Sequence, residues 1–255
     1  MTDRTALARR ALAALDLTRL DDSDTPERIE ALCASADTPW GRPAAVCVYP
    51  EFVATARAAL ARHGLTGVRV ATVVNFPDGA DDSGRAVREI RRALGAGADE
   101  IDAVLPWRSF RAGHHAAAAR FVRACRDACG ERTLKVILET GELDDDGLIA
   151  RASGLAIAGG ADFIKTSTGK VPVNATPSAA RIMLETIRDS GGRCGFKAAG
   201  GIRTLDEAAQ YFALADAILG PEWATPARFR LGASALLGDV LGTLGGTRTS
   251  TTVTY

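Results

Sequence analysis

The sequence alternates between two kinds of segment, and this alternation restricts the fold more than any other feature. Short apolar runs recur along the chain, and most are followed by a longer stretch whose apolar residues have helical spacing. The runs are continuously apolar, which is typical of strands buried on both faces, as in a parallel sheet. We therefore expect strands at eight places: residues 44–49, 68–75, 100–105, 134–139, 163–164, 194–198, 216–219 and 229–231.

Helices are expected ahead of the first of these strands. Residues 3–15 are alanine-rich with helical spacing, residues 16–18 lead out of that helix, and Thr25-Pro26 provides the start of a second one. Eight strands that alternate with helices most simply close into a (β/α)8 TIM barrel, here with extra N-terminal helices. An open doubly wound sheet is the alternative, but it usually has a glycine-rich motif after its first strand, and residues 49–52 do not provide one.

The length of the chain fits one large domain. A single α/β barrel commonly has about 250 residues, and no linker or shift in composition divides the 255 residues here. We expect one barrel domain over residues 1–246. Residues 247–255 offer little that could be buried, so we expect a flexible C-terminal tail there.

The charges and cysteines exclude several classes of protein. Lysine plus arginine and aspartate plus glutamate each total 31, so no basic excess indicates a nucleic acid or an anionic membrane as partner. No apolar run is long enough to span a bilayer, and the N-terminus does not have the pattern of a signal peptide. The five cysteines are scattered and odd in number, which is typical of reduced thiols, so we expect a cytoplasmic protein.

A lysine ends the apolar segment 163–164, directly before Thr166-Ser167-Thr168-Gly169. A buried ammonium group is unfavourable unless it is paired or has lost its proton, and a neutral lysine amine forms Schiff bases with carbonyl substrates. The alternative is that Lys165 merely extends its charge to solvent. A second strand of the same design ends at Lys197, and this favours the catalytic interpretation, because two neighbouring cations repel and one can then stay neutral near pH 7.

Three more polar residues are candidates inside such a barrel. Asp102 interrupts an apolar strand, so it either forms a buried ion pair with a lysine or relays protons through a water molecule. Cys47 is interpreted as a small residue that lines the pocket. Lys135 is a rival for the Schiff base, but it lies early in its strand, so we expect it lower in the barrel, paired and unreactive.

Glycines and a helix start at the ends of strands favour a phosphate-binding site. Gly200-Gly201 follows one strand, and Gly232-Ala233-Ser234 leads into the last helix, which we expect to begin near Ser234. Glycines allow the backbone to approach an anion closely, and a helix N-terminus offers free N–H groups. Gly169 is a further candidate. The histidines lack the clustered spacing of a zinc site, so we expect neither a metal nor a cofactor.

These residues closely resemble class I deoxyribose-phosphate aldolase. The resemblance rests on Gly-Ala-Asp-Phe-Ile-Lys165-Thr-Ser-Thr-Gly-Lys-Val and on Gly-Phe-Lys197-Ala-Ala-Gly-Gly-Ile-Arg, in this order, and it extends over nearly the whole chain. It implies an enzyme that reversibly cleaves 2-deoxy-D-ribose 5-phosphate to acetaldehyde and D-glyceraldehyde 3-phosphate, in deoxyribonucleotide catabolism. It also implies a barrel without a metal, and a homodimer is typical of such relatives.

The resemblance implies a role for each site residue. Lys165 forms the Schiff base, Lys197 lowers the pKa of Lys165, and Asp102 relays protons. Further contacts with the substrate are implied for the following residues: Asp16, Thr18, Cys47, Thr168, Gly169, Gly200, Gly201, Ser234 and Tyr255. The terminal Tyr255 is expected to enter the site and assist proton transfer to the enamine. Two alternatives stay open: another class I aldolase of sugar phosphates, and a non-catalytic barrel that binds a sugar phosphate.

Overall fold

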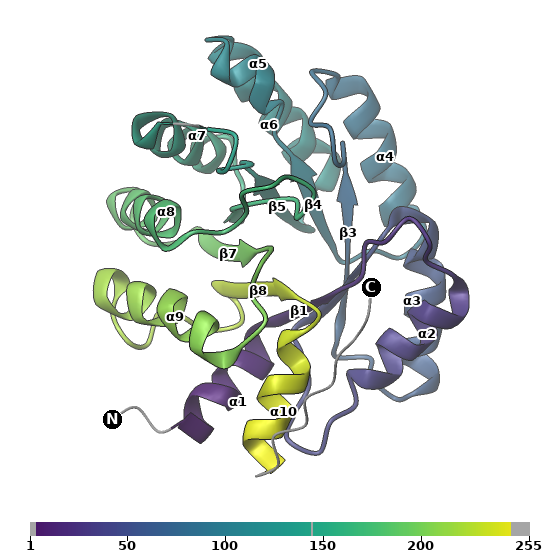
Figure 1. Ribbon diagram of the computed structural model, residues 1–255. Helices are drawn as coiled ribbons and strands as arrows, with labels where there is room; N and C mark the ends of the chain where they lie inside the picture. The colour runs from purple at the N-terminus through teal and green to yellow at the C-terminus, as the bar shows by residue number, and fades with distance from the viewer. Residues whose placement is uncertain (1–3, 144, 246–255) are drawn as a thin grey trace.

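The computed structural model describes residues 4–143 and 145–245 and shows a closed barrel of parallel strands. The strands follow one another around the barrel in chain order, and β1 pairs with β8 to close it (Figure 1). Within the described residues the strands are β1 Leu15–Thr18, β2 Ala45–Val48, β3 Arg69–Val74, β4 Glu100–Val104, β5 Thr133–Ile137, β6 Phe163–Lys165, β7 Gly195–Ala199 and β8 Phe229–Ala233. The predicted (β/α)8 TIM barrel is confirmed.

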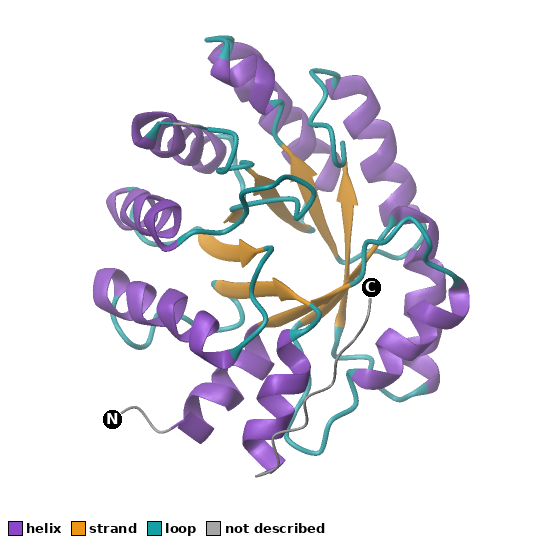
Figure 2. Ribbon diagram, in the orientation of Figure 1, coloured by secondary structure: helices purple, strands orange, loops and turns teal. Residues whose placement is uncertain are grey.

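Helices connect the strands and surround the barrel, as Figure 2 shows. In the described part of the chain they are α1 Arg4–Ala14, α2 Pro26–Ser35, α3 Val53–Arg62, α4 Ser83–Gly95, α5 Trp107–Arg111, α6 His115–Cys129, α7 Asp146–Ala158, α8 Pro177–Asp189, α9 Leu205–Leu219 and α10 Leu236–Gly245. A short 3-10 helix, η1 Pro50–Phe52, precedes α3. The last helix therefore begins two residues after Ser234.

Side-chain caps explain where several helices begin. The side chains of Thr25, Thr176 and Thr204 accept hydrogen bonds from the backbone N–H three residues later, at the starts of α2, α8 and α9. These bonds satisfy N–H groups that have no partner inside the helix. At α9 the Glu207 side chain also accepts from the Thr204 backbone, which completes a capping box.

The first strand lies earlier in the chain than the sequence predicted. Residues 16–18 do not lead out of a helix; they belong to β1, which starts at Leu15. The strand is formed because Leu15 and Leu17 pack into the outer core, while Asp16 between them faces the opposite side and bonds inside the barrel. Only α1 is thus an extra N-terminal helix, whereas α2 connects β1 with β2.

The predicted strand at residues 216–219 is wrong, because this segment ends helix α9. The buried positions of α9 recur at helical spacing, from Leu205 through Ala208 and Phe212 to Ala215. Asp216 lies on another face and bonds to Arg10 of α1 at 2.8 Å. The apolar run 217–219 at the end of a helix has the same composition as a buried strand, so periodicity alone does not distinguish the two.

Apolar residues form two separate clusters. The larger one fills the space between the strands and the surrounding helices, and it includes outward-facing strand residues such as Val46 and Val70. The smaller one lies inside the barrel and consists of four residues of β2 and β3: Ala45, Cys47, Ala71 and Val73. We call these four residues the apolar wall.

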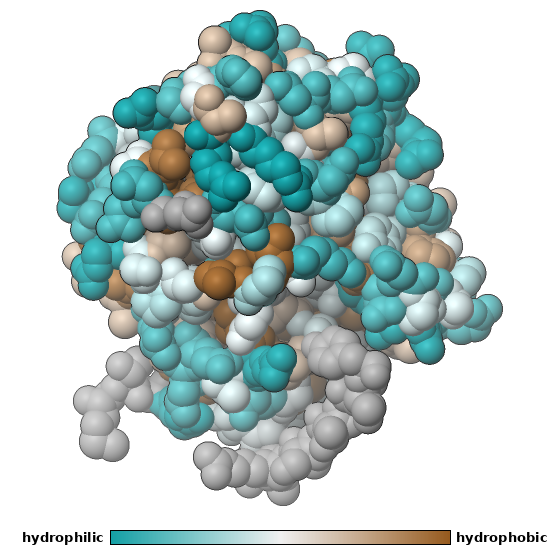
Figure 3. Space-filling model, turned by 45° about the horizontal axis from the view of Figure 1, so that its top comes forward, coloured by the Kyte–Doolittle hydropathy of each residue, from teal (hydrophilic) through white to brown (hydrophobic). Residues whose placement is uncertain are grey.

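The outer surface is mainly hydrophilic. Figure 3 shows one face of the molecule, on which hydrophilic residues predominate and a smaller group of apolar residues lies near the centre. Among the described residues, Val173 is the large hydrophobic residue with substantial exposure, at 51%. No helix in the described ranges is long and apolar enough to cross a membrane.

Candidate active site

Charged side chains from six strands meet inside the barrel. They form what we call the charged cluster: Asp16, Glu100, Asp102, Lys135, Lys165, Lys197 and Arg230. All seven are buried. The strand register brings them together, because Asp102 of β4 lies beside Lys135 of β5, and Lys165 of β6 lies beside Lys197 of β7. Side chains at matched positions of parallel strands point to the same side of the sheet.

Both predicted catalytic lysines bond to the predicted catalytic aspartate. Lys165 Nζ and Lys197 Nζ each donate to Asp102 Oδ2 at 2.8 Å. Lys197 Nζ also donates to Asp16 Oδ2 at 2.6 Å, so Asp16 belongs to the same group. The contact between Asp102 and the lysines is direct and does not require an intervening water. A proton can therefore pass between Asp102 and Lys165 along one hydrogen bond.

A second set of bonds lies on the other oxygens of the two aspartates. Lys135 Nζ donates to Asp102 Oδ1 at 2.9 Å and to Glu100 Oε2 at 2.5 Å. Arg230 Nη1 donates to Asp16 Oδ1 at 2.6 Å, and Arg230 Nη2 donates to Glu100 Oε1 at 2.9 Å. The prediction that Lys135 is buried and paired is confirmed.

Sequence reasoning missed Glu100 and Arg230. Both carry the same signal that identified the two lysines, namely a charged residue within an apolar strand. Their partners could not be read from the sequence, because the Arg230–Glu100 contact joins residues that are 130 positions apart.

The environment shifts the pKa values of Lys165 and Lys197 in opposite directions. Burial lowers the pKa of Lys165, and the neighbouring Lys197 cation lowers it further, although Asp102 opposes both effects. For Lys197, burial also acts to lower the pKa, but the carboxylates of Asp102 and Asp16 outweigh it, and its pKa is raised. The pKa of Asp102 is well below its usual range, because the surrounding cations outweigh its burial. Lys165 is thus the lysine of this pair that loses its proton more readily.

The apolar wall faces the same interior as the charged cluster. Cys47 lies at its centre, beside Ala71 of β3, and is completely buried, so its interpretation as a pocket-lining residue fits its position. Burial raises the pKa of the Cys47 thiol, which therefore stays protonated and is a poor nucleophile. Leu20, Tyr49 and Phe76 pack against this wall.

The segment after β6 is held by a buried glutamate. Thr168 donates through its backbone N–H to Glu139 Oε1 at 3.1 Å and through its hydroxyl to Glu139 Oε2 at 2.6 Å. Glu139 has a φ of 59°, an unusual conformation for a residue with a side chain, and such conformations are concentrated at functional sites. The position of Thr168, three residues after Lys165, is thus fixed by the neighbouring β5 segment.

The candidate phosphate-binding residues follow the carboxyl ends of three adjacent strands. Gly169 follows β6, Gly200-Gly201 lies at the end of β7, and Ser234 directly follows β8. Gly201 has a φ of 83° and no atom lies near the place that a side chain would take, so its backbone is open to a ligand. Gly232 serves a different purpose. A Cβ there would lie 3.0 Å from Lys197 Cε, so the missing side chain makes room for the lysine.

Thr18 and Tyr255 are also predicted to contact the substrate. Thr18 ends β1 and is half-buried, and its hydroxyl donates to the backbone carbonyl of Asp16 at 2.7 Å. Tyr255 and the predicted tail over residues 247–255 lie outside the described residues.

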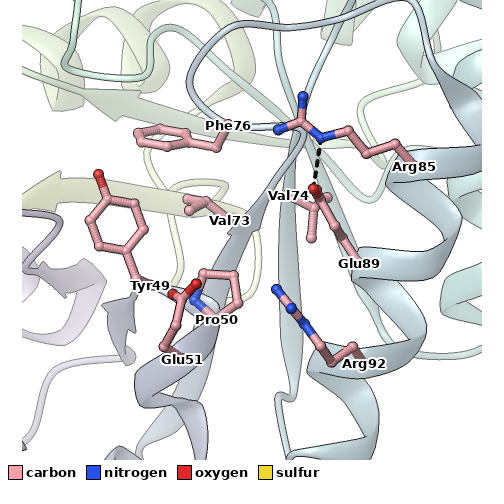
Figure 4. A pocket seen from close by; sticks show the side chains of 9 residues that line it. All are labelled: Tyr49, Pro50, Glu51, Val73, Val74, Phe76, Arg85, Glu89 and Arg92. Carbon is pink, nitrogen blue, oxygen red and sulfur yellow. Dashed lines mark hydrogen bonds and ion pairs between the residues drawn. The ribbon is translucent and has the colours of Figure 1, made fainter. Parts of the chain in front are cut away.

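A cavity of about 210 Å³ lies next to the barrel, between the end of β2 and helix α4 (Figure 4). Its described lining residues are Tyr49, Pro50, Glu51, Val73, Val74, Phe76, Arg85, Glu89 and Arg92. Arg85 and Glu89 bond to each other at 2.8 Å across one helical turn. The cavity is smaller than a typical ligand pocket, and it is not lined by Lys165, Lys197 or Asp102, so it is separate from the charged cluster.

The carboxylates of the charged cluster, which are possible metal ligands, form ion pairs with cationic side chains. In the described part of the chain, no group of three or more histidine, cysteine, aspartate or glutamate residues is arranged to hold a metal ion. The carboxylates of Asp16, Glu100 and Asp102 are bonded to lysine and arginine side chains instead. The arrangement is suited to amine and proton chemistry.

Known proteins share both the sequence pattern and the fold. The sequence model of the DeoC/LacD family aldolases matches residues 10–238. A structure of a protein from Toxoplasma gondii ME49, provisionally assigned as a deoxyribose-phosphate aldolase, is 29% identical, has a TM-score of 0.88, and covers 95% of this chain and 97% of that chain. A protein from Coccidioides immitis with the same provisional assignment is 32% identical, with a TM-score of 0.79 and coverage of 92% of this chain and 87% of that chain.

A more distant structure supports the fold alone. The deoxyribose phosphate aldolase from Aeropyrum pernix, which is described as tetrameric, is 24% identical and has a TM-score of 0.73. The match covers 95% of this chain and 92% of that chain. The arrangement of strands and helices is thus retained where most residues differ.

Proposed function

The chain belongs to the DeoC/LacD family of aldolases, whose model matches residues 10–238, and from this premise we propose a Schiff-base aldolase that reversibly cleaves 2-deoxy-D-ribose 5-phosphate. The products are acetaldehyde and D-glyceraldehyde 3-phosphate. One observation carries the proposal: the amine of Lys165 is buried at the end of β6, and it bonds to Asp102 beside the cationic Lys197. A lysine with a lowered pKa in such a position is suited to attack a carbonyl carbon.

The first half of the reaction forms the imine. The neutral Lys165 amine attacks C1 of the open-chain sugar, and water is lost as the protonated imine forms. This step needs one proton transfer away from the nitrogen and one to the departing hydroxyl. Asp102 Oδ2 lies 2.8 Å from Lys165 Nζ and is the proposed group for both transfers. Lys197 stays cationic and is assigned to electrostatics.

The second half breaks the C2–C3 bond. The C3 hydroxyl loses its proton, the C3 oxygen forms the aldehyde of D-glyceraldehyde 3-phosphate, and the bond electrons move into the imine to give an enamine. Protonation of the enamine at C2 and hydrolysis of the resulting imine release acetaldehyde and restore the amine. The group that accepts the C3 proton must lie close to the substrate, and Asp102 is the proposed base.

The phosphate group is assigned to the end of β7 and the start of the last helix. Gly201 offers open backbone, and α10 begins at Leu236, two residues after Ser234. Backbone N–H groups at such a position are suited to an anion. Asp16, Thr18, Cys47, Thr168, Gly169 and Gly200 complete the proposed contacts with the substrate. Tyr255 is retained as a proton-transfer residue on the resemblance alone, since it lies outside the described residues.

We further propose a cytoplasmic enzyme that acts as a homodimer. Residues 1–246 are proposed to form its one domain, with 247–255 as a tail. Sedimentation of the purified protein would test the dimer directly.

The Schiff base is tested by trapping it. Borohydride added together with acetaldehyde should reduce the imine and leave an ethyl group on Lys165, which mass spectrometry of the peptides can locate. Unmodified Lys197 and Lys135 in the same digest are the internal controls. Labelling of either of these lysines in place of Lys165 would overturn the assignment, and no covalent label at all would contradict a class I mechanism.

A further inference from the structure

Beneath the reacting lysine the barrel contains charged groups that the proposed reaction does not use. Lys135, Glu100 and Arg230 are buried and do not bond to Lys165. Placing three charged groups in a protein interior is unfavourable unless they are paired or serve a purpose. Apolar side chains usually fill the interior of a TIM barrel at this depth, so the charges need an explanation.

We propose that Lys135 and Arg230 are positioning residues that keep the amine of Lys165 neutral by neutralising Asp102 and Asp16 from below, and that Glu100 holds these two cations and limits their effect. The proposal rests on the Schiff-base role of Lys165 given above. It adds that the reactivity of this amine depends on residues that touch neither Lys165 nor the substrate.

The first support is that each aspartate bonds to different cations through its two carboxylate oxygens. Asp102 presents Oδ2 to Lys165 and Lys197 and presents Oδ1 to Lys135. Asp16 presents Oδ2 to Lys197 and presents Oδ1 to Arg230. Because a lower cation already neutralises part of each carboxylate, Asp102 attracts a proton on Lys165 less strongly than a free carboxylate would.

The second support is the balance of charge. The cluster contains three carboxylates, and Lys135, Lys197 and Arg230 provide three cations without Lys165. A protonated Lys165 would give the buried cluster an excess positive charge. Such an excess is unfavourable in a water-excluded interior, whereas a neutral Lys165 leaves the cluster balanced.

Glu100 has a distinct place in this arrangement. It bonds to Lys135 and to Arg230 and therefore links the two lower cations to each other. Its carboxylate opposes their positive charge. Removing Glu100 and removing Lys135 should therefore change the pKa of Lys165 in opposite directions.

Other charged or titratable groups also face Lys165. They come from the strands and segments around it: Asp102 of β4, Lys197 of β7, Cys47 of β2 and Glu139 after β5. The proposed experiment leaves all of them in place, so a change in the titration of Lys165 reports on the lower residues alone.

The test compares Lys135→Met with Glu100→Gln. The pKa of Lys165 would be measured in two ways: from the acid side of the pH profile of kcat/KM, and from the pH dependence of the rate at which an amine reagent labels the Lys165 peptide. Lys135→Met leaves Asp102 Oδ1 without its cation, so the profile should move up by about one pH unit, a tenfold loss of neutral amine at low pH. Glu100→Gln leaves the lower cations uncompensated, so the profile should move down by a similar amount.

Two further variants make the result decisive. Lys135→Met/Glu100→Gln removes one charge of each sign, and its profile should lie within about 0.3 pH unit of the unchanged protein, because the two effects oppose. Arg10→Met removes a cation from the Arg10–Asp216 pair outside the barrel and should not move the profile. Circular dichroism would identify variants that fail to fold.

Each outcome decides the matter. Opposite shifts in the two single variants support the proposal, whereas shifts of the same sign or no shifts overturn it. If both single variants fail to fold, a large shift in the double variant also overturns it, and an unmoved profile supports it. Imine trapping on a lysine other than Lys165 would instead refute the proposed function, so the two failures are distinguishable.

Discussion

The interior of this barrel has two unlike sides. Strands β1 and β4 to β8 contribute the charged cluster, whereas β2 and β3 contribute the apolar wall of Ala45, Cys47, Ala71 and Val73. Both sides are buried to a similar degree and both arise from the same alternation of side chains along parallel strands. They differ in what the buried positions hold, so the difference lies in chemistry and not in architecture.

The two sides depend on each other. An apolar wall excludes water and so strengthens every interaction among the charges opposite it. Burial is the largest contribution to the lowered pKa of Lys165. Reactivity should therefore be sensitive to charge on one side and to volume on the other.

Lys165→Met should abolish the reaction. The variant lacks the amine to which we assign the covalent intermediate, so we expect kcat to fall by a factor on the order of 10⁴ or more. The fold should persist, because the three remaining cations still balance the three carboxylates of the cluster. Turnover of 2-deoxyribose 5-phosphate and thermal unfolding would be measured together. Substantial residual turnover would remove Lys165 from the mechanism, and strong destabilisation would show that its amine was charged.

Lys197→Leu should lower activity less but should destabilise the protein more. Loss of this cation removes the 2.6 Å bond to Asp16 Oδ2, which keeps only the 3.8 Å ion pair with Lys135 Nζ, and breaking a buried ion pair in this way costs roughly 3 kcal/mol. The pKa of Lys165 should rise, because a repelling cation is lost and Asp102 has one partner fewer. Since the reaction needs the neutral amine, activity should appear only at higher pH.

The pH profile of kcat/KM measures this shift. The free energy of unfolding of Lys197→Leu would be compared with that of Lys165→Met, because each substitution removes one buried lysine from the charged cluster. An unchanged pH profile in Lys197→Leu, with most of the activity retained, would contradict the electrostatic role of Lys197.

The sequence predicted the fold and three residues of the charged cluster, Asp102, Lys165 and Lys197, because both depend on local patterns. A lysine that ends an apolar strand is visible in a single segment, and Lys165 and Lys197 share that design. The (β/α)8 barrel follows from the alternation of apolar runs with helices. The roles of these lysines stay predictions until they are tested.

The errors had physical causes as well. β1 has four residues and directly follows α1 without a glycine or proline between them, so the local pattern does not separate it from the end of a helix. Three of the four residues in 216–219 are apolar, but the capping box at Thr204 belongs to a helix that continues through them. Arg230 and Glu100 were missed because their contact exists only once the barrel closes.

Gly201→Leu should weaken binding of the phosphorylated substrate. Gly201 lies just beyond the β7 end of the charged cluster, and a side chain there would occupy open space that we assign to the phosphate. Loss of one charge-assisted hydrogen bond predicts that KM for 2-deoxyribose 5-phosphate rises about tenfold, while kcat/KM for unphosphorylated deoxyribose changes by less than about twofold.

Gly191→Leu is the matched control, because Gly191 also has a positive φ and open surroundings but lies before β7, at the opposite end of the barrel. Both variants carry the same backbone strain, so both should lose similar stability. Equal effects of Gly201→Leu on the two substrates would mean that the glycine serves only the fold.

Cys47→Ala should have the smallest effect and should test the apolar wall directly. The thiol is fully buried and its pKa is raised by burial, so it is neither a nucleophile nor a proton donor near neutral pH. Removing the sulfur atom leaves a small cavity and should lower the free energy of unfolding by about 1 kcal/mol, with kcat changed by less than about threefold. Cys33→Ala is the matched control, because Cys33 is buried between α2 and α3, outside the barrel, and bonds to the Ala56 carbonyl. If Cys47→Ala instead lowers kcat more than a hundredfold while Cys33→Ala does not, the wall takes part in the chemistry, and the division into a charged side and a volume-filling side is wrong.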